Sequence, residues 1–452
     1  MPGAGTESNG LRLLLCLAIF ICTVPGRTSS QTPHGFLTVA LNDTQTRPSD
    51  PPGLSVSADG RFVAFASHAR LTVDDTNDLS DIYVLDRATR AVTLETPASA
   101  GHVRQASATA PHLSGDGRLL VYETVEDAVG VPLRIAMLRD RLTGVTRPLQ
   151  RGGQRPDGSV GIACVSAGGE AVAFSSSATN VVEAPDANGA GEDVYLLNVA
   201  SMLFRRVSVD SLNRQSASGE SYAPAISADG RYVAFSSTAS LDGIVRPRRL
   251  VELYMRDTQL GVTTRISVAA DGGLANGPSY GAALSGDGRY VAFVSDATNL
   301  VKRRDRNRAP DVYLRDLLTK MTELVSHNRS GESANGASRL PVISQDGRIV
   351  VFQSQASDLI CGARCAESDR DINLVADIFV HDRARGQTSR VSRGSTGWME
   401  SSIGPAIDAS ATVIAFSSRH PRDAADDRDD YDLFVWGSDR WTSPAEAGRW
   451  QP

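Results

Sequence analysis

Residues 226–235 read ISADGRYVAF, and near-copies of this stretch recur along the whole chain. Four copies are clear: LSGDGRYVAF at 284–293, ISQDGRIVVF at 343–352, VSADGRFVAF at 56–65 and LSGDGRLLVY at 113–122. Two are degenerate: VSAGGEAVAF at 165–174 and IDASATVIAF at 407–416. The Gly of the Asp-Gly pair, or its equivalent, falls at positions 60, 117, 169, 230, 288, 347 and 411. A period of this length is typical of a repeat architecture.

Each copy predicts a β-hairpin, because Asp-Gly between two apolar runs supplies the positive φ that such turns require. After the two strands of the hairpin, a third strand follows that is also apolar, such as DIYVLD at 81–86. A fourth strand comes after it, such as TTRIS at 263–267. Four antiparallel strands per unit, repeated radially, predict an all-β fold that is a single β-propeller. Seven blades are favoured over six because seven copies are countable. A β-solenoid is the alternative, but its repeats are usually shorter.

One further stretch predicts how the ring closes. FLTVAL at 36–41 precedes the first full unit and has the pattern of a fourth strand. We expect it to complete the last blade, so that the N-terminal strand closes the ring and no sheet edge stays exposed.

The repeat SxDGRxVAF, followed by DVYxxD and TGxTxRVS, resembles the TolB-like (WD-like) propeller repeat of exported bacterial proteins. The resemblance covers roughly residues 36–440. It implies the fold and says almost nothing about function, since one fold hosts many functions. TolB itself is not expected, because too few residues precede the first blade for the extra N-terminal domain of that family. The propeller of prolyl-oligopeptidase relatives is also similar, but the hydrolase domain of those enzymes is missing.

Composition excludes several classes of protein. The chain has 452 residues, of which 41% are hydrophobic, and a net charge of −6. These values exclude a disordered chain, a collagen and a multi-span membrane protein, and they argue against a nucleic-acid partner. Of the 46 basic residues only Lys302 and Lys320 are lysine, which indicates a GC-rich and hence bacterial genome.

The N-terminus predicts export. Arg12 precedes the apolar run LLLCLAIFICTV at 13–24, and the small residues of GRTSS follow. This is the layout of a secretory signal peptide. We therefore expect a signal peptide at 1–30, the propeller at 31–445 and a C-terminal tail at 446–452. The mature chain is then periplasmic or extracellular, without a transmembrane domain; an uncleaved membrane anchor is the alternative.

An oxidising compartment permits a disulfide between Cys361 and Cys365, which flank a short polar stretch. Two free thiols are the alternative. Cys164 lies on an apolar strand and is expected to be buried and inert.

In such a blade the first and third connections lie on one face, and the second and fourth lie on the other. The sequence predicts tight first and third connections and long second and fourth ones. Binding residues concentrate on long loops, so we take the long-loop face and the channel mouth as the expected binding surface.

The second connections carry an Asp-x-Asn pattern followed by a further Asp, which clusters the oxygen ligands that Ca²⁺ takes. The alternative is turn chemistry, because Asp and Asn side chains bond to their own backbone in turns. The candidate metal ligands are Asp75, Asn77, Asp81, Asp186, Asn188, Asp193, Asp305, Asn307, Asp311, Asp371, Asn373, Asp377, Asp426 and Asp432.

The same loops predict a basic sector that could steer a charged partner. The candidate partner-binding residues are Arg246, Arg248, Arg249, Arg303 and Arg304. Solvated loops without a partner are the alternative.

No catalytic or cofactor-binding residue is assigned. GPSYG at 277–281 fits the pattern of a nucleophile elbow, but it leads into a first strand instead of a strand-to-helix turn. The available imidazoles, including those of His102, His112, His327 and His381, are scattered. We expect a monomeric, exported, non-catalytic module that binds or scaffolds a protein, peptide or glycan on its long-loop face. The alternative is a propeller lyase or hydrolase acting on an envelope or extracellular polymer. His, Arg and carboxylate converging at the channel mouth would favour the enzyme.

Overall fold

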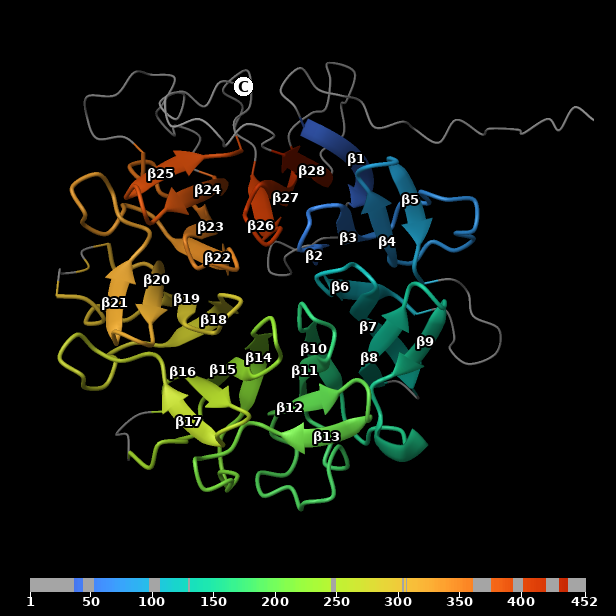
Figure 1. The fold of residues 1–452 in the computed structure, drawn as a ribbon, viewed down its shortest axis with the longest axis horizontal. Helices are drawn as coiled ribbons and strands as arrows, with labels where there is room; N and C mark the ends of the chain where they lie inside the picture. Colours follow the sequence, from blue (N-terminus) through green and yellow to red (C-terminus); the bar gives the residue numbers. More distant parts are fainter. Residues whose placement is uncertain are drawn as a thin grey trace, which may run out of the picture.

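The computed structural model describes residues 36–43, 53–96, 106–128, 131–244, 249–302, 305, 307–360, 375–392, 401–419 and 431–437. These residues form seven four-stranded antiparallel sheets arranged as a ring (Figure 1). The seven-bladed β-propeller is therefore confirmed, and the six-bladed and solenoid alternatives are wrong.

The strands of each blade run from the ring's inner edge outward. Blade 1 is β2 (Leu54–Val56), β3 (Phe62–Ser67), β4 (Asp81–Asp86) and β5 (Ala91–Leu94). Blade 2 is β6 (Ala108–Leu113), β7 (Leu119–Ala128), β8 (Val131–Asp140) and β9 (Val145–Pro148), followed by the 3-10 helix η1 (Arg151–Gly153). Blade 3 is β10 (Val160–Val165), β11 (Ala171–Ser176), β12 (Asp193–Asn198) and β13 (Leu203–Arg206). Blade 4 is β14 (Ser221–Ile226), β15 (Tyr232–Ser237), β16 (Glu252–Asp257) and β17 (Val262–Arg265).

The other three blades follow the same plan. Blade 5 is β18 (Ser279–Leu284), β19 (Tyr290–Ser295), β20 (Asp311–Asp316) and β21 (Met321–Leu324). Blade 6 is β22 (Ser338–Ile343), β23 (Ile349–Ser354), β24 (Asp377–Asp382) and β25 (Gln387–Arg390). Blade 7 is β26 (Ser402–Ile407), β27 (Val413–Ser418), β28 (Tyr431–Gly437) and, as its outermost strand, β1 (Phe36–Asp43). The predicted closure by the N-terminal strand is confirmed.

The repeated Ser-x-Asp-Gly-Arg stretch is a hairpin held by its own side chains. In blade 1 the Ser57 hydroxyl donates to Asp59 at 2.6 Å and accepts from the Phe62 N–H at 2.9 Å. Gly60 has φ of 71°, which few other residues adopt without strain. Arg61 then pairs with Asp86 at the end of the third strand, at 2.7 Å. This pair holds the pKa of the Asp86 carboxyl down, at about 2.

Backbone hydrogen bonds link the hairpins into a closed belt. The Ala58 N–H donates to the Gly115 carbonyl, and each hairpin donates in the same way to the next one around the ring. The seventh of these bonds, from Ala409 to the Ala58 carbonyl, returns to the first blade at 3.1 Å. Blade 7 is thus joined to blade 1 on this face as well as through β1. We call this side, which carries the first and third connections, the hairpin face.

The core of most blades centres on an aromatic pair. The Phe of the second strand stacks on the Tyr or Phe of the third strand, as in Phe235 and Tyr254 with ring centroids 6.3 Å apart. Five other blades repeat the stack. Aromatic rings bury much apolar area, so one pair per blade accounts for the VAF and DVY positions of the repeat.

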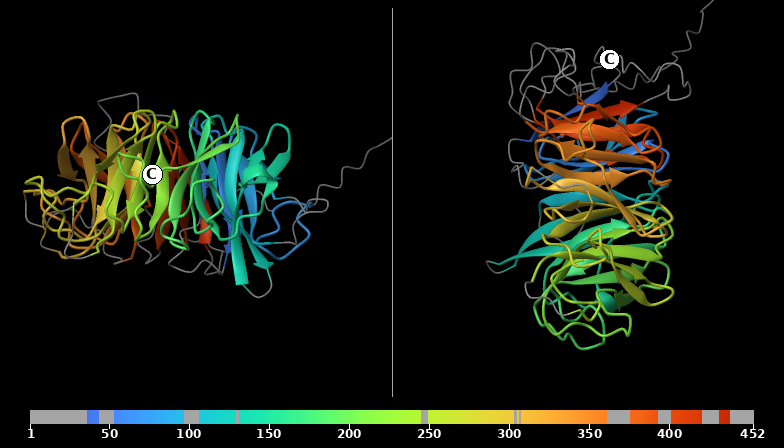
Figure 2. Two further views of the ribbon diagram at one scale, coloured as in Figure 1. Left: turned by 90° about the horizontal axis from the view of Figure 1, so that it is seen from below. Right: turned by 90° about the vertical axis from the view of Figure 1, so that its left-hand side faces the viewer.

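Blade 2 departs from the predicted loop lengths. Its strands β7 and β8 each have ten residues and are joined directly, so the second connection there is short. Figure 2 shows these strands extending beyond the neighbouring blades. The prediction that every second connection is a long loop is therefore wrong for blade 2, because its strands continue pairing where other blades begin a loop.

Cys164 is a buried free thiol whose pKa burial raises to about 12, as expected of an inert cysteine. Cys361 and Cys365, the signal peptide at 1–30 and the tail at 446–452 lie outside the described residues. In the part of the chain that the structure describes, no helix is long and apolar enough to cross a membrane.

Candidate functional site

The predicted metal ligands of blade 1 form a turn that bonds to itself. The carboxylate of Asp75 accepts from the Asn77 N–H at 3.1 Å, and the Asn77 side chain donates to Asp81 at 3.1 Å. The remaining oxygens of the two carboxylates are also used, because Asp75 accepts from the Tyr83 hydroxyl and Asp81 accepts from Thr96, both at 2.5 Å. The structure therefore brings Asp75, Asn77 and Asp81 together with the geometry of turn chemistry.

In blade 3 a glutamine and an arginine fill the same loop. The amide of Gln215 donates to Asp186 at 2.8 Å, to Asn188 at 2.6 Å and to Asp193 at 2.5 Å. Arg206 lies 3.5 Å from Asp186 and 3.4 Å from Asp193. The guanidinium takes the place that a cation would need between the two carboxylates.

In blade 5 the fourth strand has Leu324 at the position that Arg206 takes in blade 3. Asn307 donates to Asp311 at 3.3 Å and to the Ala334 carbonyl at 2.6 Å, and its own N–H donates to Asp305. Asp311 is fully buried and accepts from Ser326 at 2.7 Å. Burial, reinforced by the charge of Asp305, raises the pKa of the Asp311 carboxyl to about 7.

A difference in the fourth strand separates these loops. Arg206, Arg265 and Arg390 pair with the carboxylate that begins the third strand of their own blade, in blades 3, 4 and 6. In blades 1 and 5 the equivalent position is Leu94 or Leu324. The segment TTRIS at 263–267 contains one of these arginines, Arg265, but its partner Glu252 lies on the neighbouring strand and has no signature in the local sequence.

The remaining predicted ligands are divided between described and undescribed residues. Asp377 accepts from Ser392 at 2.5 Å, and Asp432 is buried in β28. Asp371, Asn373 and Asp426 lie outside the described residues. Within the described ranges, no group of three or more His, Cys, Asp or Glu side chains could hold a metal ion. Calcium binding at these loops stays a prediction.

The predicted basic sector is described only in small part. Arg249 is exposed, whereas Arg246, Arg248, Arg303 and Arg304 lie outside the described residues.

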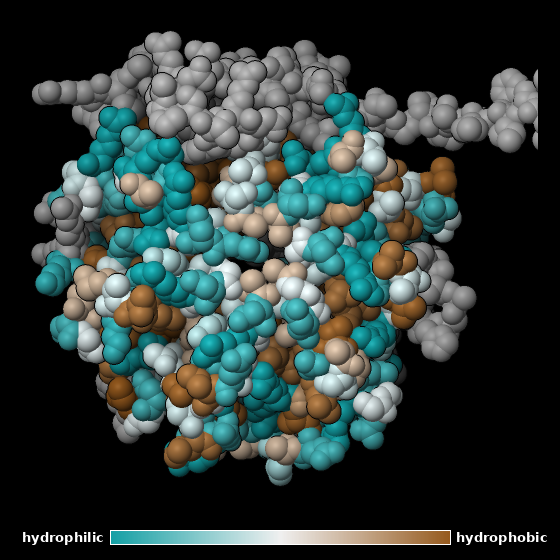
Figure 3. Space-filling model, viewed as in Figure 1, coloured by the Kyte–Doolittle hydropathy of each residue, from teal (hydrophilic) through white to brown (hydrophobic). Residues whose placement is uncertain are grey.

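Residues that the sequence analysis missed gather at the inner edge of the ring. The innermost strands of adjacent blades contact one another around the centre, which is hollowed in the space-filling view (Figure 3). The innermost strands of blades 2 to 7 start on the long-loop face, so their second residues lie at that end of the ring's inner edge. We call these residues the channel mouth: Thr109, Gly161, Tyr222, Tyr280, Arg339 and Ile403.

The channel mouth carries hydrogen-bonding groups that are within reach of solvent. Arg339 is exposed and donates to the hydroxyl of Tyr280 at 2.7 Å, across the boundary between blades 5 and 6. That hydroxyl in turn donates to Asp296 at 3.4 Å. Tyr222 is half-buried, and burial raises the pKa of its hydroxyl. The Ser221 N–H donates to the Glu192 carbonyl at 2.7 Å, so Glu192 and Glu220 lie beside the start of β14. Acidic residues therefore lie next to Tyr222, whereas Tyr280 contacts both Arg339 and Asp296.

The innermost strands are also kinked just below the mouth. Their pairing with the second strand shifts register, as between Tyr222 and Ala225. A left-handed residue lies at the shift, with φ of 51° at Ala110, 49° at Ala223 and 51° at Leu340. A positive φ is uncommon for residues other than glycine, and in a β-bulge it bends the strand.

Two of the histidines considered for catalysis are internal. Burial lowers the pKa of His112 to about 4, and its ring accepts from the Val165 N–H at 3.4 Å. His381 is buried, bonds to Thr388 at 2.9 Å and has its pKa lowered to about 4, first by burial and then by the neighbouring His327. The six residues named as the channel mouth include Arg339 but no histidine and no carboxylate, and Asp296 is the carboxylate that contacts Tyr280.

The described architecture defines the chain as a β-propeller. An oligogalacturonate lyase in complex with manganese is similar, with 14% identity over 91% of this chain and 98% of that chain and a TM-score of 0.51. The β-propeller domain of the Trilobed protease from Pyrococcus furiosus is similar at 11% identity, over 86% and 96% of the two chains, with a TM-score of 0.50. TolB from Acinetobacter baumannii matches at 14% identity over 75% of this chain and 65% of that chain, with a TM-score of 0.40. These likenesses show the fold alone. No protein-family model and no curated protein matches the chain.

Proposed function

We propose that the chain is an exported, non-catalytic module that binds a peptide or glycan at the channel mouth. The observation that supports this proposal is the placement of Tyr222, Tyr280 and Arg339 at the same strand position in three consecutive blades. Tyrosine and arginine are the residues that most often dominate binding surfaces, because they combine large contact area with hydrogen bonding. Three such side chains on the rim of one opening form a continuous surface.

The charges around the channel mouth limit the chemical class of ligand that could bind there. Glu192 and Glu220 lie on the side of Tyr222, and Arg339 lies on the side of Tyr280. A polymeric ligand with hydroxyl or amide donors could donate hydrogen bonds to the carboxylates, while its own carboxylate or carbonyl oxygens accept hydrogen bonds from Arg339. Peptides and acidic glycans offer both kinds of group.

A panel titration tests the proposal. Peptides and oligosaccharides of acidic, neutral and amino-sugar type are titrated against the protein from residue 31, with binding measured by calorimetry. The Tyr280→Ala variant should weaken binding about tenfold or more, as a hot-spot truncation does. Leu203→Ala, at an exposed position on the outer strand of blade 3, is the matched control and should bind as the parent does. Equal binding by both variants would refute the channel mouth as the site.

The alternative, a lyase or hydrolase, follows only from the shared fold. The same panel, including oligogalacturonate with manganese, should therefore be examined for product formation. Turnover that Tyr280→Ala abolishes would replace the binding proposal with the enzymatic one.

Calcium at the acidic loops is a separate proposal, compatible with either function. It is supported by the buried Asp311 and Asp81, each of which has a leucine where other blades have an arginine.

A further inference from the structure

The hairpin face contains a repeated slot between neighbouring blades, which is filled by an aromatic ring. The ring belongs to the residue after the hairpin arginine: Phe62 in blade 1, Tyr232 in blade 4 and Tyr290 in blade 5. In blade 1 the guanidinium of Arg61 lies 4.7 Å from the ring centre, and Arg141 of the next blade lies 4.9 Å from it. Tyr290 is held in the same way between two arginines, Arg289 and Arg383.

The following blade supplies a glycine against each ring. A Cβ atom on Gly117 would come within 2.5 Å of the Phe62 ring, and Gly288 and Gly347 approach Tyr232 and Tyr290 as closely. The ring is thus packed between arginine and the bare backbone of a hairpin. No larger side chain fits at these glycines.

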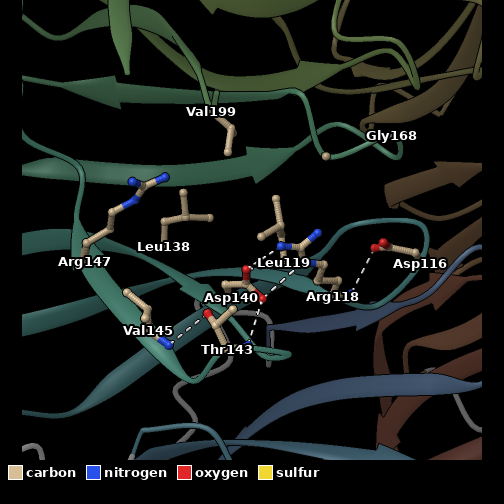
Figure 4. A pocket seen from close by; sticks show the side chains of 11 residues that line it. Asp116, Arg118, Leu119, Leu138, Asp140, Thr143, Val145, Arg147, Gly168 and Val199 are labelled. Atoms are coloured by element: carbon tan, nitrogen blue, oxygen red, sulfur yellow. Dashed lines mark hydrogen bonds and ion pairs between the residues drawn. The ribbon is translucent and has the colours of Figure 1, made fainter. Parts of the chain in front are cut away.

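Between blades 2 and 3 this ring is missing, as it is after blades 3, 6 and 7, where the position is Ala171, Ile349 and Val413. Leu119 occupies the ring position, and Val199 occupies the position of Arg141 and Arg383. The glycine is retained, but a Cβ atom on Gly169 would meet only a Leu119 methyl, at 3.3 Å. A cavity of about 420 Å³ opens here, lined by Leu119, Leu138, Val199, Gly168, Arg118 and Arg147 among others (Figure 4).

The two arginines of the cavity differ in their partners. Arg118 is paired with Asp140 at 2.7 Å, as the hairpin arginine is in other blades. Arg147 is half-buried, and its backbone pairs with Leu138 in the sheet. Among the residues that the structure describes, none forms a hydrogen bond or ion pair with its guanidinium. In blade 5 the equivalent residue is Glu323, which pairs with Arg383. The position of Arg383 is Val199 in blade 3, and a valine side chain cannot form an ion pair. The charge of Arg147 is therefore available to a ligand.

We propose that this cavity binds an aromatic carboxylate. The aromatic ring packs on the Arg118 guanidinium and against the side chains of Leu119, Leu138 and Val199. The carboxylate pairs with Arg147, which is suited to planar two-point recognition of carboxylates. The ligand is a free aromatic acid or the C-terminal aromatic residue of a peptide. This site is on the hairpin face, opposite the channel mouth, and is independent of the function proposed above.

Binding of two small probes tests the proposal. Phenylacetate is titrated against the protein, with ligand-observed NMR as the readout, and cyclohexylacetate serves as the non-planar control. A fragment of this size should bind with a dissociation constant on the order of 1 mM. Cyclohexylacetate should bind several-fold more weakly, since only an aromatic ring stacks favourably on a guanidinium. Equal binding of both probes, or no binding of phenylacetate, would overturn the assignment. N-acetyl-phenylalanine and its amide distinguish a peptide terminus from an internal residue, because only the former offers a carboxylate to Arg147.

Two variants locate the site. Leu119→Phe restores the ring of the other slots and should abolish phenylacetate binding, whereas Leu203→Phe adds a ring at an exposed position and should leave it unchanged. Arg147→Gln, a partly exposed change that does not touch the core, should weaken phenylacetate about tenfold and leave neutral phenylacetamide unaffected. Phenylacetate that binds Leu119→Phe as well as it binds the parent would refute the site, and so would an unchanged affinity in Arg147→Gln.

Discussion

Replacing Arg206 by leucine should convert the acidic loop of blade 3 into that of blade 5. The Arg206 side chain is 7% exposed, and the carboxylates it faces, Asp186 and Asp193, are 4% and 3% exposed. Removing one partner of a buried ion pair leaves uncompensated charge and costs about 3–5 kcal/mol of unfolding free energy. We expect a loss of this size for Arg206→Leu at pH 8.

The loss should depend on pH. Burial raises the pKa of Asp193 to about 6, and Asp311, which has no arginine, has a pKa raised to about 7. A folded-state pKa above the unfolded value means that the group favours the native state at low pH, and that this advantage disappears as pH rises through the folded pKa. Moving the pKa of Asp193 from about 6 to about 7 therefore accounts for about 1.4 kcal/mol of the loss at pH 8, and this part is almost absent at pH 5.

Denaturant unfolding followed by tryptophan fluorescence at pH 5 and pH 8 measures both quantities. Arg70→Leu is the matched control, because Arg70 pairs with Asp78 in an exposed loop at 2.8 Å, and such pairs contribute about 0–1 kcal/mol. If Arg206→Leu cost no more than Arg70→Leu, or cost the same at both pH values, the guanidinium would not be the counter-charge of this loop.

Three further predictions follow from the same contacts. Asp311→Asn should remove the part of the pH dependence that titrates near pH 7, because its carboxyl favours the native state below that pH; an unchanged stability profile between pH 5 and 8 would contradict the assignment. Leu119→Phe should raise the unfolding free energy by about 1 kcal/mol, as cavity filling does, and a lowered midpoint in urea would show that the slot cannot hold a ring. The calcium proposal predicts a gain of about 2.7 kcal/mol at one hundred times the dissociation constant, lost in Asp311→Ala, whereas a melting temperature that is the same in calcium and chelator would leave these loops as turn chemistry.

The fold was predictable because the repeat is chemically complete within a short stretch. The Ser57 hydroxyl bonds to Asp59, and Gly60 supplies the positive φ of the turn. The hairpin is therefore determined by residues that are adjacent in the sequence. Closure by β1 was predictable from the missing fourth strand of the last blade. The extended strands of blade 2 were not foreseen, because the residues that continue the pairing resemble loop residues of the other blades.

The channel mouth had no local signature. Tyr280 and Arg339 are 59 residues apart, and only the ring brings them to a 2.7 Å contact. The bulges at Ala110 and Ala223 could not be predicted either, because alanine has no preference for a positive φ. The slot at Leu119 could have been found by aligning the repeats, since LSGDGRLLVY has leucine where the copies of blades 1, 4 and 5 have an aromatic residue.

The most direct test of the binding account is site-specific photo-cross-linking in cells that produce the protein. A benzophenone amino acid is placed at position 280 and, as control, at position 203 on the exposed edge of blade 3. The account predicts a discrete adduct with a peptide or glycan from position 280 that competes with the ligand found by titration, and none from position 203. Adducts of the same kind from both positions, or none from position 280, would contradict a binding site at the channel mouth.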